Sequence, residues 1–486
     1  MGILRKLASQ SAIYGLSSVV PRLLNYFLVS LHSRVFTESQ YGVITELYAY
    51  VAVLLILLTF GLETGFFRFA GKKETPKQGN QVFSTIFYFL GATSIGFFGL
   101  TWLFLDPIAS ALHYGGDEKL LLMMFGILAI DAWSAPLFNR LRWQERPKTY
   151  SAIKIISVVV NIGLNLLFLL VYPQMGYYNQ DFGVGYVLLS NLIASGVAWV
   201  LAFIASGTLP RVFRWSLLTP ILAFSFPLLL SGLAGTTNEF MDRLFIKWLT
   251  PASDPMSELG IYGATGKIAV LLVLCVQMFK FAAEPFFFSR ADEREDPKVY
   301  AMVTKYFWYF TLLVFVGILF YIPILQYFIG REFRTGIGVI PILLVANLLY
   351  GLFFNVSFWY KIQKRTWYGV LLTLTGAGVT LLVNLLLTPQ LSYYGAAIAR
   401  VASYLVMCIL CILIGKRYFP VPYEYRKFFF SLLFSCSILG VGYLLSSFHW
   451  WVMLGGRSLL LLLLVYLLMH LERISPRQLL HSWKRK

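Results

Sequence analysis

The chain has 486 residues, of which 58% are hydrophobic and 13% are charged, and its mean hydropathy is +0.72. A water-soluble protein cannot keep so much apolar surface out of water, so the composition excludes a soluble fold and indicates a protein that lies in lipid. The net charge of +18 does not indicate nucleic-acid binding, because the basic residues cluster in alternate segments between apolar runs.

Apolar runs long enough to cross a bilayer (about 20 residues each) occupy nearly the whole chain. We place them at 11–32, 42–67, 82–105, 119–139, 150–172, 183–207, 217–249, 260–289, 300–325, 337–362, 367–388, 393–415, 425–447 and 450–471. The period-2 alternation of a membrane barrel is absent, so helices are the spanning structure. The sequence therefore predicts an all-α polytopic membrane protein with about 14 transmembrane helices.

The basic residues lie mainly in the N-terminal segment, in alternate loops and in the C-terminal tail. The loops after the second and fourth runs, for example, carry Arg68, Lys72, Lys73, Lys77, Arg140, Arg142, Arg146 and Lys148. This distribution follows the positive-inside rule and predicts that both termini are cytoplasmic. A basic inner face also favours anionic lipid headgroups, so membrane lipids are expected partners.

Two halves of the chain resemble each other. Asn25 and Asn238 begin similar stretches at an offset of 213, and Asn165 aligns with Asn384 at an offset of 219. Six apolar runs in each half give both halves the same orientation, which predicts parallel repeats. We expect a six-helix lobe at 1–210, a second six-helix lobe at 211–418, and two further helices with a basic tail at 419–486.

Several segments resemble bacterial polysaccharide-biosynthesis flippases, which export O-antigen and exopolysaccharide precursors. These segments are Y-G-L-S-S-V-V-P-R-L-L-N-Y-F-L-V and E-S-Q-Y-G-V-I-T-E-L-Y-A-Y in the first half, and A-E-P-F-F-F-S-R-A-D-E at 283–293. The resemblance covers almost the whole chain and implies the fourteen-helix fold of the multidrug/oligosaccharidyl-lipid/polysaccharide superfamily. It departs at Ser30–Arg34, where the family pattern is Pro-Leu-Tyr-Thr-Arg.

The first helix carries an arginine near its middle. Arg22, Asn25 and His32 share one helical face, and Arg22 lies about 18 Å along the axis from Arg34. The resemblance implies that an arginine in this helix binds the pyrophosphate of the substrate, which a planar guanidinium suits. The alternative is an Arg22 paired with an acidic neighbour for packing.

Further candidates lie in the second half, since charges inside membrane helices usually face a cavity or a partner. In the seventh helix, Asn238 and Asp242 lie on a line that is expected to face the first helix across a cleft. Arg243 follows Glu239 by one turn, so an internal salt bridge is the simpler interpretation for it. Lys267 and Arg400 form an expected cationic patch near the outer helix ends, unless both snorkel to the interface.

Two carboxylates are candidates for ion coupling. Asp131 lies alone in the middle of the fourth helix and could exchange a proton or bind Na⁺; the alternative is a hydrogen bond to Trp133 or to a neighbouring helix. Glu63 ends the second helix, where capping or pairing with Arg68 is the structural alternative.

The sequence leads to the hypothesis of an inner-membrane flippase that moves polyprenyl-pyrophosphate-linked oligosaccharide by alternating access, coupled to H⁺ or Na⁺. The alternatives are a lipid II flippase and a cation-coupled multidrug exporter. We expect no enzyme activity, no catalytic residues, no nucleic-acid partner and no cofactor, because no large loop and no nucleotide-binding motif is present. No metal site is expected either, since Cys408 and Cys411 lack a second pair or a nearby His. A polysaccharide polymerase or other export machinery is an expected partner.

Overall fold

The computed structural model describes residues 20, 21, 23–71, 76–207, 212–289, 297–363 and 365–473. Within these ranges all regular secondary structure is helical, and thirteen helices are long and apolar enough to cross a membrane. Of the first expected run, 23–35 is a continuous helix through the point where the family pattern has a proline, while its beginning lies outside the described residues. The prediction of an all-α polytopic membrane protein is therefore confirmed.

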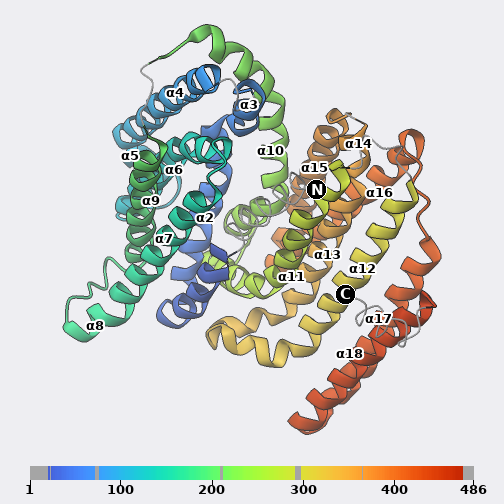
Figure 1. The fold of residues 1–486 in the computed structure, drawn as a ribbon. Helices are drawn as coiled ribbons and strands as arrows, with labels where there is room; N and C mark the ends of the chain where they lie inside the picture. The colour runs from blue at the N-terminus through green and yellow to red at the C-terminus, as the bar shows by residue number, and fades with distance from the viewer. Residues whose placement is uncertain are drawn as a thin grey trace. The chain divides into compact units, whose positions relative to one another are not determined.

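The helices follow one another with short connections (Figure 1). The α-helices are α2 (Glu38–Thr59), α3 (Leu62–Phe69), α4 (Pro76–Leu103), α5 (Leu105–Ala111), α6 (Glu118–Trp143), α7 (Pro147–Leu166), α8 (Tyr172–Met175), α9 (Gly185–Ser206), α10 (Trp215–Leu249), α11 (Pro255–Ser289), α12 (Pro297–Leu325), α13 (Ile340–Val356), α14 (Phe358–Ile362), α15 (Trp367–Leu391), α16 (Tyr393–Tyr418), α17 (Tyr425–Leu444) and α18 (Trp450–Leu471). A π-helical turn at Leu167–Val171 joins α7 to α8, and 3₁₀ turns lie at Gln326–Phe328, Glu332–Val339 and Leu445–Ser447.

The chain forms two compact units, each of which combines separate segments. The first unit contains the described residues of Met1–Ala264 and Thr373–Arg400, and the second contains those of Thr265–Leu372 and Val401–Lys486. Three helices, α11, α15 and α16, thus contribute one part to each unit. The division into two six-helix lobes and an appended helix pair stays a prediction.

Local sequence signals explain how individual helices begin and end. Thr37 caps α2 by accepting a hydrogen bond from the backbone of Gln40, whose side chain in turn accepts from the backbone N–H of Thr37. Between α2 and α3, Phe60 and Gly61 both adopt the left-handed conformation, which ends the first helix and starts the second. Pro147 opens α7 at a position where no intrahelical N–H is needed.

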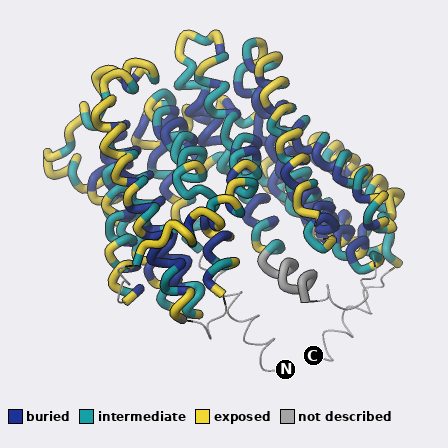
Figure 2. The backbone as a smooth tube through the Cα atoms, turned by 90° about the horizontal axis from the view of Figure 1, so that it is seen from above, coloured by how far each residue is buried: buried dark blue, intermediate teal, exposed yellow. Residues whose placement is uncertain are grey.

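Each unit has its own apolar core, and apolar side chains also cover much of the outside. Phe66, Phe83 and Leu137 pack in the first unit, whereas Trp359 and Cys411 pack in the second. Figure 2 shows exposed and buried positions alternating along the helices. On α15 the exposed positions include four leucines: Leu381, Leu382, Leu385 and Leu386. Such exposed apolar surface suits lipid as the surrounding solvent.

Candidate functional site

The most polar part of α10 centres on Asp242, which is only 2% exposed although it lies inside a membrane-spanning helix. Its Oδ2 accepts a hydrogen bond from the hydroxyl of Tyr262 on α11. Its Oδ1 accepts from the backbone N–H of Arg243 at 2.9 Å. A buried carboxylate needs such partners, because an unpaired charge in a low-dielectric interior is costly.

Two guanidinium groups lie beside this carboxylate. Arg243 Nη1 is 3.3 Å from Asp242 Oδ1, and Arg400 Nη1 on α16 is 3.8 Å from Asp242 Oδ2. In these described contacts, two guanidinium groups lie against one carboxylate. Asp242 lies seven residues before the end of α10, and Arg400 lies seven residues after the start of α16, so each is about 10 Å along the axis from its helix end.

Asn238 lies one turn before Asp242 on the same face of α10 and extends the polar surface. Its Oδ1 accepts a hydrogen bond from Thr380 at 3.0 Å, and its Nδ2 donates to the backbone carbonyl of Thr373 at 3.3 Å. On α15, Asn384 donates to the carbonyl of Thr380 at 2.8 Å. The described partners of Asn238 and Asp242 include residues of α11, α15 and α16. That both residues face the first helix stays a prediction, because the beginning of that helix lies outside the described residues.

Arg243 corrects an expectation. Its guanidinium donates to the backbone carbonyl of Glu239 at 2.9 Å, and among the described residues its acidic partner is Asp242 instead of the Glu239 carboxylate. The Asp242 carboxylate is held in place by Tyr262, so Arg243 loses less side-chain entropy in pairing with it than with a carboxylate that has no such contact.

A second buried pair joins α10 to α2, and it was not among the candidates drawn from the sequence. Lys247 Nζ lies 2.8 Å from Glu46 Oε1, and Glu46 is completely buried. Tyr114 donates to Glu46 Oε2 at 2.7 Å, and Lys247 also donates to the carbonyl of Leu112 at 2.7 Å. A carboxylate inside an apolar run, as at Asp131, was the signal that could have found this pair.

Helices α2 and the beginning of α11 approach each other through two glycines. A side chain on Gly42 would overlap the carbonyl of Met256, and one on Gly260 would overlap the carbonyl of Glu38. Next to this contact, Ser257 donates to the carboxylate of Glu38 at 2.7 Å. Small residues permit such close backbone approach between membrane helices.

The first-helix candidates lie elsewhere. Asn25 accepts a hydrogen bond from Asn161 on α7 at 3.3 Å, and His32 Nε2 lies 2.8 Å from Asn165 Oδ1. Both side chains therefore lie on the face that contacts α7, as their spacing predicts. Arg22 lies outside the described residues. Lys267 is half-buried on α11 and belongs to the second unit.

The two ion-coupling candidates differ in their surroundings. Asp131 on α6 interacts with the hydroxyl of Ser195 on α9 and with the ammonium of Lys154 on α7. Its hydrogen-bond partner therefore lies on a neighbouring helix and is not Trp133. The carboxylate of Glu63 is more than half exposed and pairs with Arg142 on α6. Pairing of Glu63 with Arg68 is therefore wrong, because Arg68 instead lies over the ring of Phe224.

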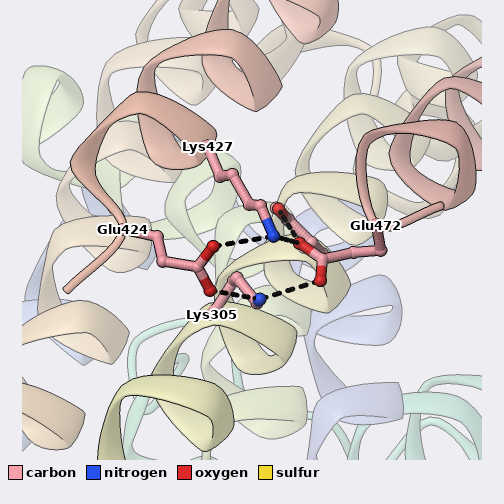
Figure 3. Close-up of polar contacts among 5 residues, drawn as sticks. Lys305, Glu424, Lys427 and Glu472 are labelled. Atoms are coloured by element: carbon pink, nitrogen blue, oxygen red, sulfur yellow. Dashed lines mark hydrogen bonds and ion pairs between the residues drawn. The ribbon is translucent and has the colours of Figure 1, made fainter. Parts of the chain in front are cut away.

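The second unit contains a charge network that sequence analysis also missed (Figure 3). Lys305 on α12 lies 2.6 Å from Glu424 and 2.8 Å from Glu472, and Lys427 on α17 contacts the same two carboxylates at 2.7 and 3.1 Å. Tyr309 donates to Glu472 at 3.0 Å. The network ties the beginning of α17 and the end of α18 to α12.

Solved structures with the same fold are transporters. The chain matches the lipid II flippase MurJ in an inward closed conformation with a TM-score of 0.74 at 14% identity, covering 94% of this chain and 99% of that one. It matches an inward-facing multidrug resistance MATE family transporter of the MOP superfamily with a TM-score of 0.65 at 14% identity, covering 84% of this chain and 94% of the other. The MATE multidrug transporter DinF-BH gives 0.60 at 16% identity, with 86% and 96% covered. These identities establish a shared fold alone.

Sequence comparison identifies the family of the chain, which the shared fold alone does not. No curated protein sequence matches the chain. The family model described as "Polysaccharide biosynthesis protein" matches residues 7–291, which is more than half of the chain and includes α2 through α11. The resemblance drawn from the sequence is confirmed. The chain is a multi-pass membrane protein that belongs to the polysaccharide biosynthesis protein family and has the fold of membrane transporters and flippases.

Proposed function

We propose that the protein is a flippase of the bacterial inner membrane, which moves a polyprenyl-pyrophosphate-linked oligosaccharide from the cytoplasmic to the outer leaflet. Membership of the polysaccharide biosynthesis family and the transporter fold support a lipid-linked substrate. The basic segments between alternate helices support an orientation with both termini in the cytoplasm. A polysaccharide polymerase or other export machinery would then receive the product.

The observation that carries this proposal is the pair of guanidinium groups at Asp242. Arg243 and Arg400 place two guanidinium groups inside spanning helices, where a phosphate loses most of its hydration. Guanidinium groups offer paired donors that match phosphate oxygens, and Asp242 keeps them oriented before the substrate arrives. Asn238 and Thr380 provide neutral hydrogen-bonding groups beside them. Arg22 and Lys267 remain proposed additional ligands of the headgroup, and Asn25 a proposed polar neighbour.

Alternating access requires that a closed contact breaks and re-forms. The glycine contact between α2 and α11 is suited to this role, because Gly42 and Gly260 bring two backbones together with few side chains between them. The Glu46–Lys247 pair joins the same helix α2 to α10 and would hold α2 in place while this contact is closed.

Energy for the cycle would come from an ion gradient. Asp131 is our first candidate for binding H⁺ or Na⁺, since it is a carboxylate in the interior of a helical unit with Ser195 and Lys154 as neighbours. Binding of a cation at Asp131 would change the electrostatic interaction with Lys154, so occupancy of this carboxylate would be coupled to the helices α6 and α7 that carry the two groups. Glu63, exposed and paired with Arg142, is the second candidate.

The test is to delete the gene and identify the lipid-linked glycan that accumulates on the inner leaflet. We expect a polyprenyl-pyrophosphate oligosaccharide, and its transport into proteoliposomes by the purified protein should depend on Arg400. The main alternative is a lipid II flippase, because 94% of this chain matches the fold of the MurJ structure. Accumulation of lipid II would overturn our assignment in favour of that alternative. Unchanged lipid-linked glycans with altered drug tolerance would instead indicate a multidrug exporter.

A further inference from the structure

An apolar pocket of about 240 Å³ opens in the second unit. Its walls come from α12, α13, α16 and α17, and they include Trp308, Val356, Ile412, Tyr423, Tyr425 and Phe428. Phe429 and Leu432 also line it and are 63% and 40% exposed, so the pocket opens on the outer surface of α17. An opening of this kind in a membrane protein faces lipid.

The pocket begins at the membrane boundary. Tyr423 precedes α17, Tyr425 is its first residue, and Leu432 follows seven residues later, so the lined stretch reaches about 10 Å along the helix. This depth corresponds to the region where lipid headgroups give way to acyl chains. A lipid acyl chain that enters from the boundary would therefore contact aromatic and aliphatic side chains along its whole length in the pocket, starting with its first methylene groups.

Three exposed cations lie at the same boundary. Lys416 and Arg417 form the last turn of α16, and Arg426 follows Tyr425 in the first turn of α17. The ammonium of Lys416 lies 5.4 Å from the ring of Tyr425, which connects the basic group directly to the pocket wall. Within the described part of the chain, none of the three pairs with a carboxylate.

The nearby carboxylates are already neutralised. Glu424 lies between the two pocket tyrosines, and its carboxylate is bound by Lys305 at 2.6 Å and Lys427 at 2.7 Å (Figure 3). These hydrogen bonds hold the pKa of Glu424 below its usual value, so it stays ionised and engaged. Glu472 is bound by the same two lysines. The charge left for an incoming ligand is therefore positive.

We propose that this pocket binds one anionic phospholipid, with part of an acyl chain against Trp308 and Phe428 and its phosphate against Lys416, Arg417 and Arg426. The charge network fixes the beginning of α17 so that the pocket and the cations keep their spacing. The surrounding bilayer supplies such a lipid at the depth where the cations lie. A polyprenyl diphosphate shares the phosphate chemistry, and the experiment separates the two sources.

The test measures lipid retention by native mass spectrometry on the purified full-length protein, given equal amounts of phosphatidylglycerol and phosphatidylcholine with identical acyl chains. A parallel sample receives a polyprenyl diphosphate in place of the two phospholipids. We expect wild-type protein to retain phosphatidylglycerol preferentially. Arg426→Gln should weaken that retention about fivefold, and the triple change Lys416→Gln, Arg417→Gln and Arg426→Gln should abolish the preference. Leu432→Trp, which fills the pocket, should reduce retention of both lipids.

The matched control is the double variant Lys148→Gln and Arg214→Gln, which removes exposed basic side chains of the first unit and should leave retention unchanged. The triple variant changes only exposed side chains, so it tests the site even if Leu432→Trp fails to fold. Unaltered phosphatidylglycerol preference in the triple variant would overturn the proposal. So would loss of polyprenyl diphosphate binding with phospholipid retention intact, which would assign the pocket to the tail of the transported lipid.

Discussion

Glu46 on α2 and Lys247 on α10 form an ion pair of 2.8 Å in which the carboxylate is completely buried. Removing one partner of such a pair leaves an uncompensated charge, which costs about 3–5 kcal/mol. We expect Lys247→Met to lower the thermal stability of the purified protein strongly. The double variant Glu46→Gln with Lys247→Met should recover most of the loss, because no buried charge then remains. Equal losses in the single and double variants would show that packing, and not the charge, is responsible.

The glycine contact between α2 and α11 predicts a large effect from a single methyl group. Gly42→Ala places a Cβ where the carbonyl of Met256 lies, so the helices have to separate. We expect a clearly lower melting temperature and increased labelling of a cysteine introduced at the contact. Gly96→Ala is the matched control, because nothing lies within 4 Å of its Cβ position. It should be neutral or stabilise the protein by about 0.5–1 kcal/mol.

The role proposed for Arg400 predicts a graded loss of transport. Arg400→Lys keeps the charge but not the paired donors, whereas Arg400→Gln removes both. A charged hydrogen bond contributes about 1.5–3 kcal/mol, so transport of lipid-linked oligosaccharide in proteoliposomes should fall about tenfold or more in Arg400→Gln and less in Arg400→Lys. Arg214→Gln, at an exposed site, serves as the control. Full activity in Arg400→Gln would remove the cluster around Asp242 from substrate binding.

Asn25 and Asn238, which begin the two similar stretches, should contribute different amounts to the stability of the protein. Asn238 is 2% exposed and makes two hydrogen bonds, whereas the exposed Asn25 accepts one at 3.3 Å. We expect Asn238→Leu to cost about 1–2 kcal/mol and Asn25→Leu about 0.5 kcal/mol or less. Comparing the melting temperatures of the two variants measures the difference, and similar losses would contradict it.

The ion pairs of Glu424 should make the stability of the protein depend on pH in the acidic range. Lys305 and Lys427 lower its pKa in the folded protein, so its stabilising effect is present above the usual value of 4.5 and is lost as the pH falls through the lowered pKa. Between pH 6 and pH 3 the melting temperature of the wild type should therefore fall more steeply than that of Glu424→Gln. Because Glu424 is 44% exposed, the difference should be modest. Parallel curves would show that the network does not depend on this charge.

The fold could be predicted from sequence, because run length and charge distribution follow directly from the bilayer. The repeat that the sequence predicts has a counterpart in the hydrogen bonds. Asn161 donates to Asn25 and Thr380 donates to Asn238, and the two pairs of positions are related by the same offsets of 213 and 219 residues. The same offsets that align residues of the two halves thus also align two hydrogen bonds between helices.

The partners of the charged side chains could not be predicted. Periodicity places Arg243 one turn from Glu239, but it does not give the rotation of α10, which turns Asp242 toward Tyr262 and Arg400. Pairs between distant segments, such as Glu46 with Lys247, depend on which helices pack together. A charged residue within an apolar run is the signal that such a pair exists. Considering every charged residue of this kind would also have identified Lys305.

The contact at Gly42 and Gly260 has a consequence for the speed of conformational change. At Gly42 and Gly260 themselves backbone meets backbone, and side chains meet only at the edges of the contact, where Thr45 packs against Gly263 and Ser257 bonds Glu38, so few rotamers have to change when the helices separate. Thr37 and Asp254 cap α2 and α11 from within their own segments, and those caps persist when the helices part. We expect opening to break the hydrogen bond from Ser257 to Glu38, which water can replace once the helices part, so the contact is suited to repeated opening and closing.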